Sequence, residues 1–168
     1  MKTILLIFSL TVTPLFLSFP IKYKVISIIN STPQSIELPL AVSSHDEMSF
    51  FTEALNITKD RLSFSLNSKG NSDVNYINKT KTAHCVGYTN YYNAVLFQIL
   101  KNSHVSSNYK IQHGRAKVIL GGIDLTGISN NPSFKDHDIS IVTNKKTGEV
   151  YCIDPSLSEV LGNIITKK

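Results

Sequence analysis

Three side chains in the second half of the sequence are of the types that carry out nucleophilic catalysis: Cys85, His137 and Asp154. A thiolate can attack a carbonyl carbon, an imidazole can move the proton, and a carboxylate can orient the imidazole and stabilise its charged form. These roles require that the fold bring the elements carrying the three side chains together.

A long helix predicted over residues 85–101 would position Cys85. Its buried stripe consists of residues at intervals of four, three and four: Tyr88, Tyr92, Val95 and Ile99. Cys85 lies on the same stripe at the N-terminal end, with Thr82 as an N-cap candidate. The partial positive charge of a helix N-terminus favours thiolate over thiol, and its unpaired amides suit a developing oxyanion.

A β-hairpin would position the other two side chains. Residues 138–142 and 149–153 are predicted as antiparallel strands joined by a turn at 144–148. Symmetric pairing about this turn places His137 opposite Asp154 at the open end of the hairpin, close enough for a hydrogen bond. A slip of one residue would put the two side chains on opposite faces.

The other predicted elements complete a mixed α+β pattern. In chain order they are a helix at 45–58, a strand at 61–66, a loop at 67–73, a short helix at 74–79, a strand at 117–120, a loop at 121–136 and a helical tail within 156–165. Four further histidines are expected at the surface or in loops, namely His45, His84, His104 and His113. Cys152 is expected in the core.

The N-terminus is predicted to be an export signal. An apolar run at residues 4–21 follows Lys2 and is interrupted by two prolines, which favours a signal peptide or an N-terminal membrane anchor over residues 1–21. The alternative is a buried pair of strands. Residues 22–43 are predicted to be a linker or extended segment, and residues 44–168 to form the domain. The protein is therefore expected in the periplasm, cell envelope or extracellular space, and residues 4–21 would anchor it if uncleaved.

Composition narrows the functional classes. The chain has 168 residues, 42% of them hydrophobic, which suits one folded domain. Its net charge of +5 is scattered without a basic stripe, which argues against a nucleic-acid partner. The sequence contains no CxxC, no HExxH, no zinc-ligand spacing among its histidines and no phosphate-binding glycine loop, so no metal or cofactor is expected.

The local sequences resemble one known family. Cys85-Val86-Gly87-Tyr88-Thr89 at a helix start resembles the C-x-G-Y-[AS] segment of the bacterial transglutaminase-like superfamily. His137 at the head of a strand, followed by Tyr151-Cys152-Ile153-Asp154-Pro155, resembles that family's His strand and its Val-Asp-Pro strand. The resemblance spans about residues 45–157. It implies a papain-like α+β core in which the nucleophile helix packs on an antiparallel sheet, with Cys85 as nucleophile, His137 as general base and acid, and Asp154 as orienter.

The sequence also departs from the family pattern. A small residue and a tryptophan often follow the family's histidine, whereas Asp138 and Ile139 follow it here, and a charge beside the base could alter its pKa or the approach of substrate. Ala83-His84 stands where the family often has glycine before the cysteine. The upstream oxyanion side chain has three candidates: Asn75, Tyr76 and Asn78.

The expected function is acyl transfer at an amide bond through a thioester, as in a cysteine peptidase or amidase acting on a protein or peptide. Hydrolysis is expected ahead of transglutamination. Two alternatives remain open: a catalytically inactive transglutaminase-like binding module of the cell envelope, and an NlpC-type cell-wall peptidase. For Cys85 itself, the alternatives are a buried structural thiol and a disulfide with Cys152.

Overall fold

The computed structural model describes residues 20–29, 32–38, 46–65, 68, 72–125, 136–162 and 164–168. Residues 1–19, which hold most of the predicted signal peptide or anchor, lie outside the described residues, as do His45 and most of the predicted 121–136 loop. Within the described part of the chain, no helix is both long enough and apolar enough to cross a membrane.

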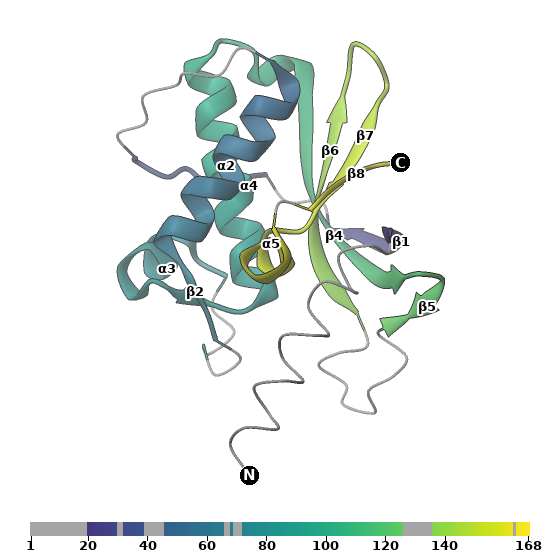
Figure 1. The fold of residues 1–168 in the computed structure, drawn as a ribbon. Helices are drawn as coiled ribbons and strands as arrows, with labels where there is room; N and C mark the ends of the chain where they lie inside the picture. The colour runs from purple at the N-terminus through teal and green to yellow at the C-terminus, as the bar shows by residue number, and fades with distance from the viewer. Residues whose placement is uncertain are drawn as a thin grey trace.

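The helices lie on one side of the molecule (Figure 1). They are α2 (Glu47–Arg61), α3 (Val74–Thr80), α4 (Cys85–Asn102) and α5 (Pro155–Leu161), with a 3₁₀ turn at Ser106–Asn108. Helix α2 begins at Glu47, two residues later than predicted, because the Asp46 carboxylate accepts the Ser49 amide at 2.9 Å and caps the helix. The predicted α4 is confirmed, and all four residues of its stripe are fully buried.

An antiparallel sheet forms the other side. Its order is β1 (Ile21–Ile29), β4 (Tyr109–Leu120), β6 (His137–Asn144), β7 (Val150–Ile153) and β8 (Ile165–Lys167), and β5 (Ile123–Asp124) pairs with the end of β4. The short strands β2 (Ser63–Phe64) and β3 (Thr82–Ala83) pair in parallel beside the helices. The predicted tail helix therefore ends at Leu161, and a strand follows it.

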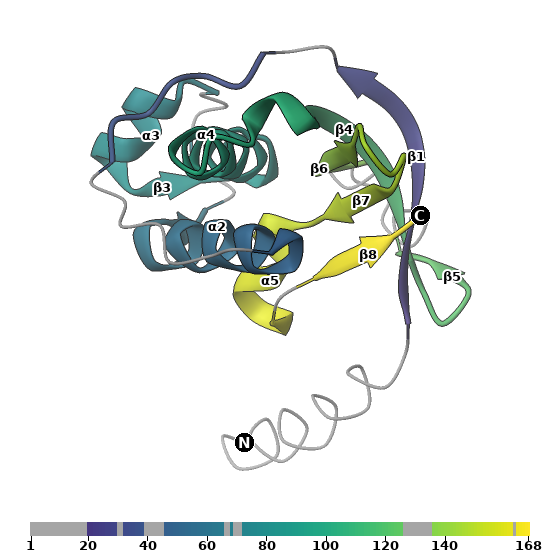
Figure 2. The same cartoon turned by 90° about the horizontal axis from the view of Figure 1, so that it is seen from above.

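Two apolar clusters hold these layers together. The larger lies between α4, α2 and the sheet, and includes Tyr92, Leu96 and Phe51 against Val142 and Ile153. The smaller lies on the other face of the sheet and joins Ala116, Ile139, Ile141 and Cys152. Strands β1 and β8 at the two ends of the sheet contact each other, so the sheet curls around this second cluster (Figure 2). The expected α+β class, with the Cys85 helix packed on an antiparallel sheet, is confirmed.

The segment predicted as a linker or extended segment is extended, but it is part of the packed domain. Strand β1 pairs with β4 along its length, with Tyr23 opposite Val118. Side chains in its first half alternate, with Tyr23 and Val25 packed on the second cluster and Lys24 exposed. Further along, Ile36 is 1% exposed in the main core. The domain therefore includes residues well before 44.

The β6–β7 register differs from symmetric pairing by two residues. Ile141 pairs with Cys152 rather than with Val150. The reason is the turn: the Asn144 amide donates to the Glu149 carbonyl at 2.9 Å, which closes the hairpin one residue later than predicted. Because side chains alternate with a period of two, this shift keeps residues 137 and 154 on the same face.

Candidate active site

Cys85 is the first residue of α4, as predicted. The cap is His84 rather than Thr82, which lies in β3; the His84 Nδ1 atom accepts the Val86 amide at 3.3 Å. His84 is half-buried and lies in the connection between β3 and α4, a loop position as expected. The amides of Cys85 and Gly87 belong to the first turn, where the helix itself provides no acceptor.

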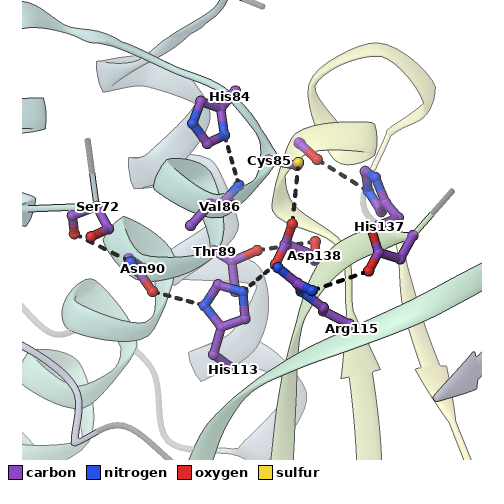
Figure 3. Close-up of polar contacts among 12 residues, drawn as sticks. Ser72, His84, Cys85, Val86, Thr89, Asn90, His113, Arg115, His137 and Asp138 are labelled. Atoms are coloured by element: carbon purple, nitrogen blue, oxygen red, sulfur yellow. Dashed lines mark hydrogen bonds and ion pairs between the residues drawn. The ribbon is translucent and has the colours of Figure 1, made fainter. Parts of the chain in front are cut away.

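The Cys85 thiol donates a hydrogen bond to Asp138 Oδ2 at 3.4 Å (Figure 3). Burial, with the charge and hydrogen bond of Asp138, raises the pKa of Cys85 to about 12. Backbone hydrogen bonds from Asp138 and Val86 act in the opposite direction but are outweighed. The helix terminus alone predicted a thiolate, whereas in this arrangement the sulfur carries its proton.

His137 and Asp154 are paired, as predicted. His137 Nε2 lies 2.8 Å from Asp154 Oδ2. The carboxylate is fully buried and also accepts from Tyr23 Oη at 2.7 Å, the Leu157 amide at 2.9 Å and Ser156 Oγ at 3.2 Å. The Leu157 bond makes Asp154 the N-cap of α5, so one side chain both starts a helix and orients the histidine.

The pairing of His137 with Asp154 determines which nitrogen of the His137 ring can accept a proton in a reaction. Burial lowers the pKa of His137, but the charge and hydrogen bond of Asp154 more than compensate, so its pKa is raised overall. Nε2 also lies 3.3 Å from Ser156 Oγ. When Nε2 carries the hydrogen that faces Asp154, a neutral ring has its lone pair on Nδ1, which is the form that a general base needs.

Cys85 and His137 meet different partners at the start of β6. Asp138 and Ser140 face α4, where Ser140 Oγ donates to Asn93 at 2.5 Å, while Ile139 packs in the second cluster. Alternation directs His137 to the face of Ile139. Among the described residues, the thiol is bonded to Asp138 and no hydrogen bond joins it to His137. The structure thus brings together two members of the predicted triad and places the third beside residue 138.

His113 is the functional candidate that sequence reasoning missed. It was expected at the surface or in a loop, but it lies within β4 and is 3% exposed. Its Nε2 is 2.6 Å from Asp138 Oδ1, and its Nδ1 is 2.8 Å from Asn90 Oδ1. The predicted strand began at Lys117, and the alternation of Arg115 and Lys117 with small or apolar residues could have extended it upstream to His113. That pattern places His113 on the face of the two charged side chains, so it gives no sign of its burial.

His113 is held between oxygen atoms of two side chains. Asn90 Nδ2 donates to the Ser72 carbonyl at 3.2 Å, which directs Asn90 Oδ1 toward His113. Asn90 and Asp138 thus each place a side-chain oxygen against one ring nitrogen of His113. Burial raises the pKa of Asp138, but hydrogen bonding and charge from His113, together with Cys85 and Arg115, lower it overall.

A pocket adjoins this network. It has a volume of about 310 Å³ and is lined in part by Val86, Asn90, Asn93 and His113. Within the described part of the chain, no group of three or more His, Cys, Asp or Glu side chains is arranged to hold a metal ion.

Cys85 forms no disulfide with Cys152. Both cysteines are free thiols, and Cys152 is buried in the second cluster as a core residue. Of the oxyanion candidates, Asn75 and Tyr76 are exposed on α3, and Asn78 Oδ1 accepts from Tyr91 Oη and Lys81 Nζ. No described hydrogen bond links any of these three to Cys85.

Comparison of the chain with protein-family models, curated proteins and solved structures found no match. The transglutaminase-like resemblance therefore stays a prediction.

Proposed function

We propose that this protein is a thiol-dependent acyl-transfer enzyme acting on amide bonds, a transglutaminase-like cysteine peptidase or amidase. The observation that carries the proposal is the His137–Asp154 pair, in which a fully buried carboxylate holds Nε2 at 2.8 Å and leaves Nδ1 to act. Support comes from Cys85, which occupies the first position of α4 next to the strand that begins with His137.

Acylation requires the thiol to leave Asp138 and to come within reach of His137, which strand alternation places on the other face of β6. The thiol proton passes to His137 Nδ1 while Sγ bonds to the amide carbonyl carbon. The first-turn amides of Cys85 and Gly87 are the donors available to the oxyanion, since His84 engages that of Val86. The C–N bond then breaks as the imidazolium returns its proton to the leaving amine, and a thioester remains.

Deacylation uses the same base. Water attacks the thioester carbonyl carbon and gives its proton to Nδ1, the C–S bond breaks, and the departing sulfur recovers the proton. The net reaction is amide plus water to carboxylic acid plus amine. An amine in place of water would transfer the acyl group instead. The substrate class that suits this chemistry is a protein or peptide, and we infer export from the N-terminal apolar run.

One observation favours a second candidate, the inactive binding module. The pKa of Cys85 is raised to about 12, and its thiol is bonded to a carboxylate rather than to a base. In such a module Cys85 would be a structural thiol, and removing it would affect stability without affecting any reaction.

The test is cleavage of a peptide-amide library by wild type, Cys85→Ala and His137→Ala, with Cys152→Ala as the matched control. Cys85→Ala should abolish cleavage, and His137→Ala should slow it by about a hundredfold or more. Cys152→Ala should retain it, because Cys152 lies in the second cluster. Mass spectrometry should find the acyl group on the Cys85 peptide. Equal cleavage by Cys85→Ala and wild type would refute the proposal, and no cleavage by wild type would favour the module.

A further inference from the structure

A continuous set of hydrogen bonds runs from the thiol into the molecule. Cys85 Sγ bonds to one oxygen of Asp138 at 3.4 Å, and His113 Nε2 bonds to the other at 2.6 Å. His113 is in turn held by Asn90 at 2.8 Å. The Asp138 backbone takes part as well, since its carbonyl accepts from Thr89 Oγ1 at 3.1 Å. Four side chains from α4, β4 and β6 therefore determine where the sulfur points (Figure 3).

The proposed reaction does not use this network, and the network makes removal of the thiol proton harder. A base must accept the thiol proton, whereas the ionised Asp138 disfavours the negative charge that would result on sulfur. The same carboxylate competes with His137 Nδ1 for the only hydrogen that the thiol can donate. The buried pair of Asp138 and His113 beside the nucleophile must therefore serve a purpose other than accepting the thiol proton.

We propose that Asp138 and His113 form a latch on Cys85: the carboxylate holds the thiol in its resting orientation and disfavours the thiolate, and His113 limits that effect by partly neutralising the carboxylate. Both are positioning residues, because they act on substrate only through Cys85. The latch rests on the proposed function in that Cys85 is the nucleophile it restrains. It predicts an enzyme whose thiol is unreactive until it leaves Asp138.

Replacing Asp138 and replacing His113 should have opposite effects on how easily Cys85 forms a thiolate, because of the groups around Asp138. Cys85 faces Asp138 from α4, His113 and Arg115 face it from β4, and His137 precedes it on its own strand. Removing the carboxylate charge should make the thiolate easier to form. Removing the His113 charge should make it harder, because the carboxylate is then less neutralised. If Asp138 and His113 served only to pack the core, both variants would loosen the structure around Cys85. The alkylation rate of Cys85 would then change in the same direction in both.

The experiment measures alkylation of Cys85 by iodoacetamide as a function of pH. Peptide-resolved mass spectrometry under reducing conditions separates Cys85 from Cys152. The variants are Asp138→Asn and His113→Gln. The matched control is Asp124→Asn, because Asp124 pairs with Lys117 at 2.8 Å near the surface and the substitution makes the same change in charge.

The expected rates follow from thiolate chemistry. A fall of about two units in the thiol pKa gives roughly a hundredfold more thiolate, which is about tenfold less nucleophilic, so Asp138→Asn should react about tenfold faster. His113→Gln should react about threefold slower, by the same reasoning for a rise of about one unit. Asp124→Asn should react at the wild-type rate.

Two results would overturn the latch: a wild-type rate in Asp138→Asn, or faster alkylation in both Asp138→Asn and His113→Gln. If circular dichroism shows that Asp138→Asn does not fold, the double variant Asp138→Asn/His113→Gln replaces it, because it pairs two neutral amides at the same positions. This double variant should also react faster than wild type, and an unchanged rate would count against the latch.

The alkylation result is separate from the result for the proposed function. Alkylation requires no amide substrate, so the latch can fail while Cys85→Ala still abolishes peptide cleavage. Conversely, the latch can hold in a protein that cleaves nothing. In an active enzyme, Asp138→Asn should also shift the pH profile of kcat/KM to lower pH, because the thiol then ionises more readily.

Discussion

Replacing Asp154 by asparagine should destabilise the protein while leaving it folded. Asp154 Oδ2 accepts from Tyr23 Oη at 2.7 Å and pairs with His137 Nε2 at 2.8 Å. Asparagine can keep its oxygen toward the Leu157 amide and so preserve the cap of α5. It then places an NH₂ group, which cannot accept, where Oδ2 received the other two donors.

The magnitude follows from those two contacts. A hydrogen bond to a charged group contributes about 1.5–3 kcal/mol, so losing two removes about 3–6 kcal/mol. The Tyr23 hydroxyl can turn to accept from the new NH₂ group, which recovers part of the loss. We expect a net loss of about 3 kcal/mol, against a total stability of about 5–15 kcal/mol for a domain of ordinary stability.

Urea unfolding followed by far-UV circular dichroism measures this loss directly. In a separate thermal melt, the melting temperature should fall by about 6–12 °C for a chain of this size. Tyr23→Phe removes one of the donors and should cost about 1.5 kcal/mol. Tyr76→Phe is the matched control, because Tyr76 is 49% exposed, and it should lie within about 0.5 kcal/mol of wild type.

An unfolding free energy for Asp154→Asn within about 0.5 kcal/mol of wild type would contradict this prediction, since a buried acceptor of several donors cannot be replaced at so small a cost. A larger loss in Tyr23→Phe than in Asp154→Asn would also contradict it, because the hydroxyl is one of several donors to that carboxylate.

Three further predictions concern stability. Burial lowers the pKa of His137, but Asp154 outweighs it and raises the pKa above its ordinary value of 6.5, so the stability from their pair is fully present below 6.5 and is lost as pH rises through the folded-state pKa. The difference in unfolding free energy between wild type and Asp154→Asn should therefore shrink as the pH rises above 6.5, and growth would contradict this. A Cβ on Gly114 would lie 2.4 Å from Ile141 Cδ1, so Gly114→Ala should cost about 1–3 kcal/mol, part of which Ile141→Val recovers; strict additivity in urea unfolding would be the contrary result. Ser103 Oγ is buried without a hydrogen-bond partner among the described residues, so Ser103→Ala should raise the unfolding free energy by about 1 kcal/mol, and a loss would show that the hydroxyl is satisfied.

Local sequence patterns predicted much of the fold, because the periodicity within a helix or strand shows which of its residues are buried. The stripe of Tyr88, Tyr92, Val95 and Ile99 repeats at helical spacing, and all four are buried. The β6–β7 hairpin is closed by a turn within the same stretch of chain, so its error was limited to a shift of two residues. That shift preserved the pairing of His137 with Asp154, because strand side chains alternate with a period of two.

Features that depend on distant segments were not predicted. Strand β1 is held by β4, so Tyr23 lies opposite Val118, and no local pattern identifies a partner so far along the chain. The same long-range pairing brings the Tyr23 hydroxyl to Asp154. His113 alone resembles any surface histidine, and it becomes buried because its face of β4 meets Asn90 of α4 and Asp138 of β6.

Local sequence is enough to place Cys85 at the start of a helix and His137 with Asp154 at the open end of one hairpin, because helix periodicity and strand alternation are local properties. The hydrogen-bond partner of the thiol, in contrast, depends on how distant segments pack. Docking of α4 on β6 brings Sγ to Asp138, and burial with that carboxylate raises the pKa of Cys85, against the effect of the helix terminus. Hydrogen bonding and desolvation depend on which groups meet in space, and for Cys85 those groups come from separate segments of the chain.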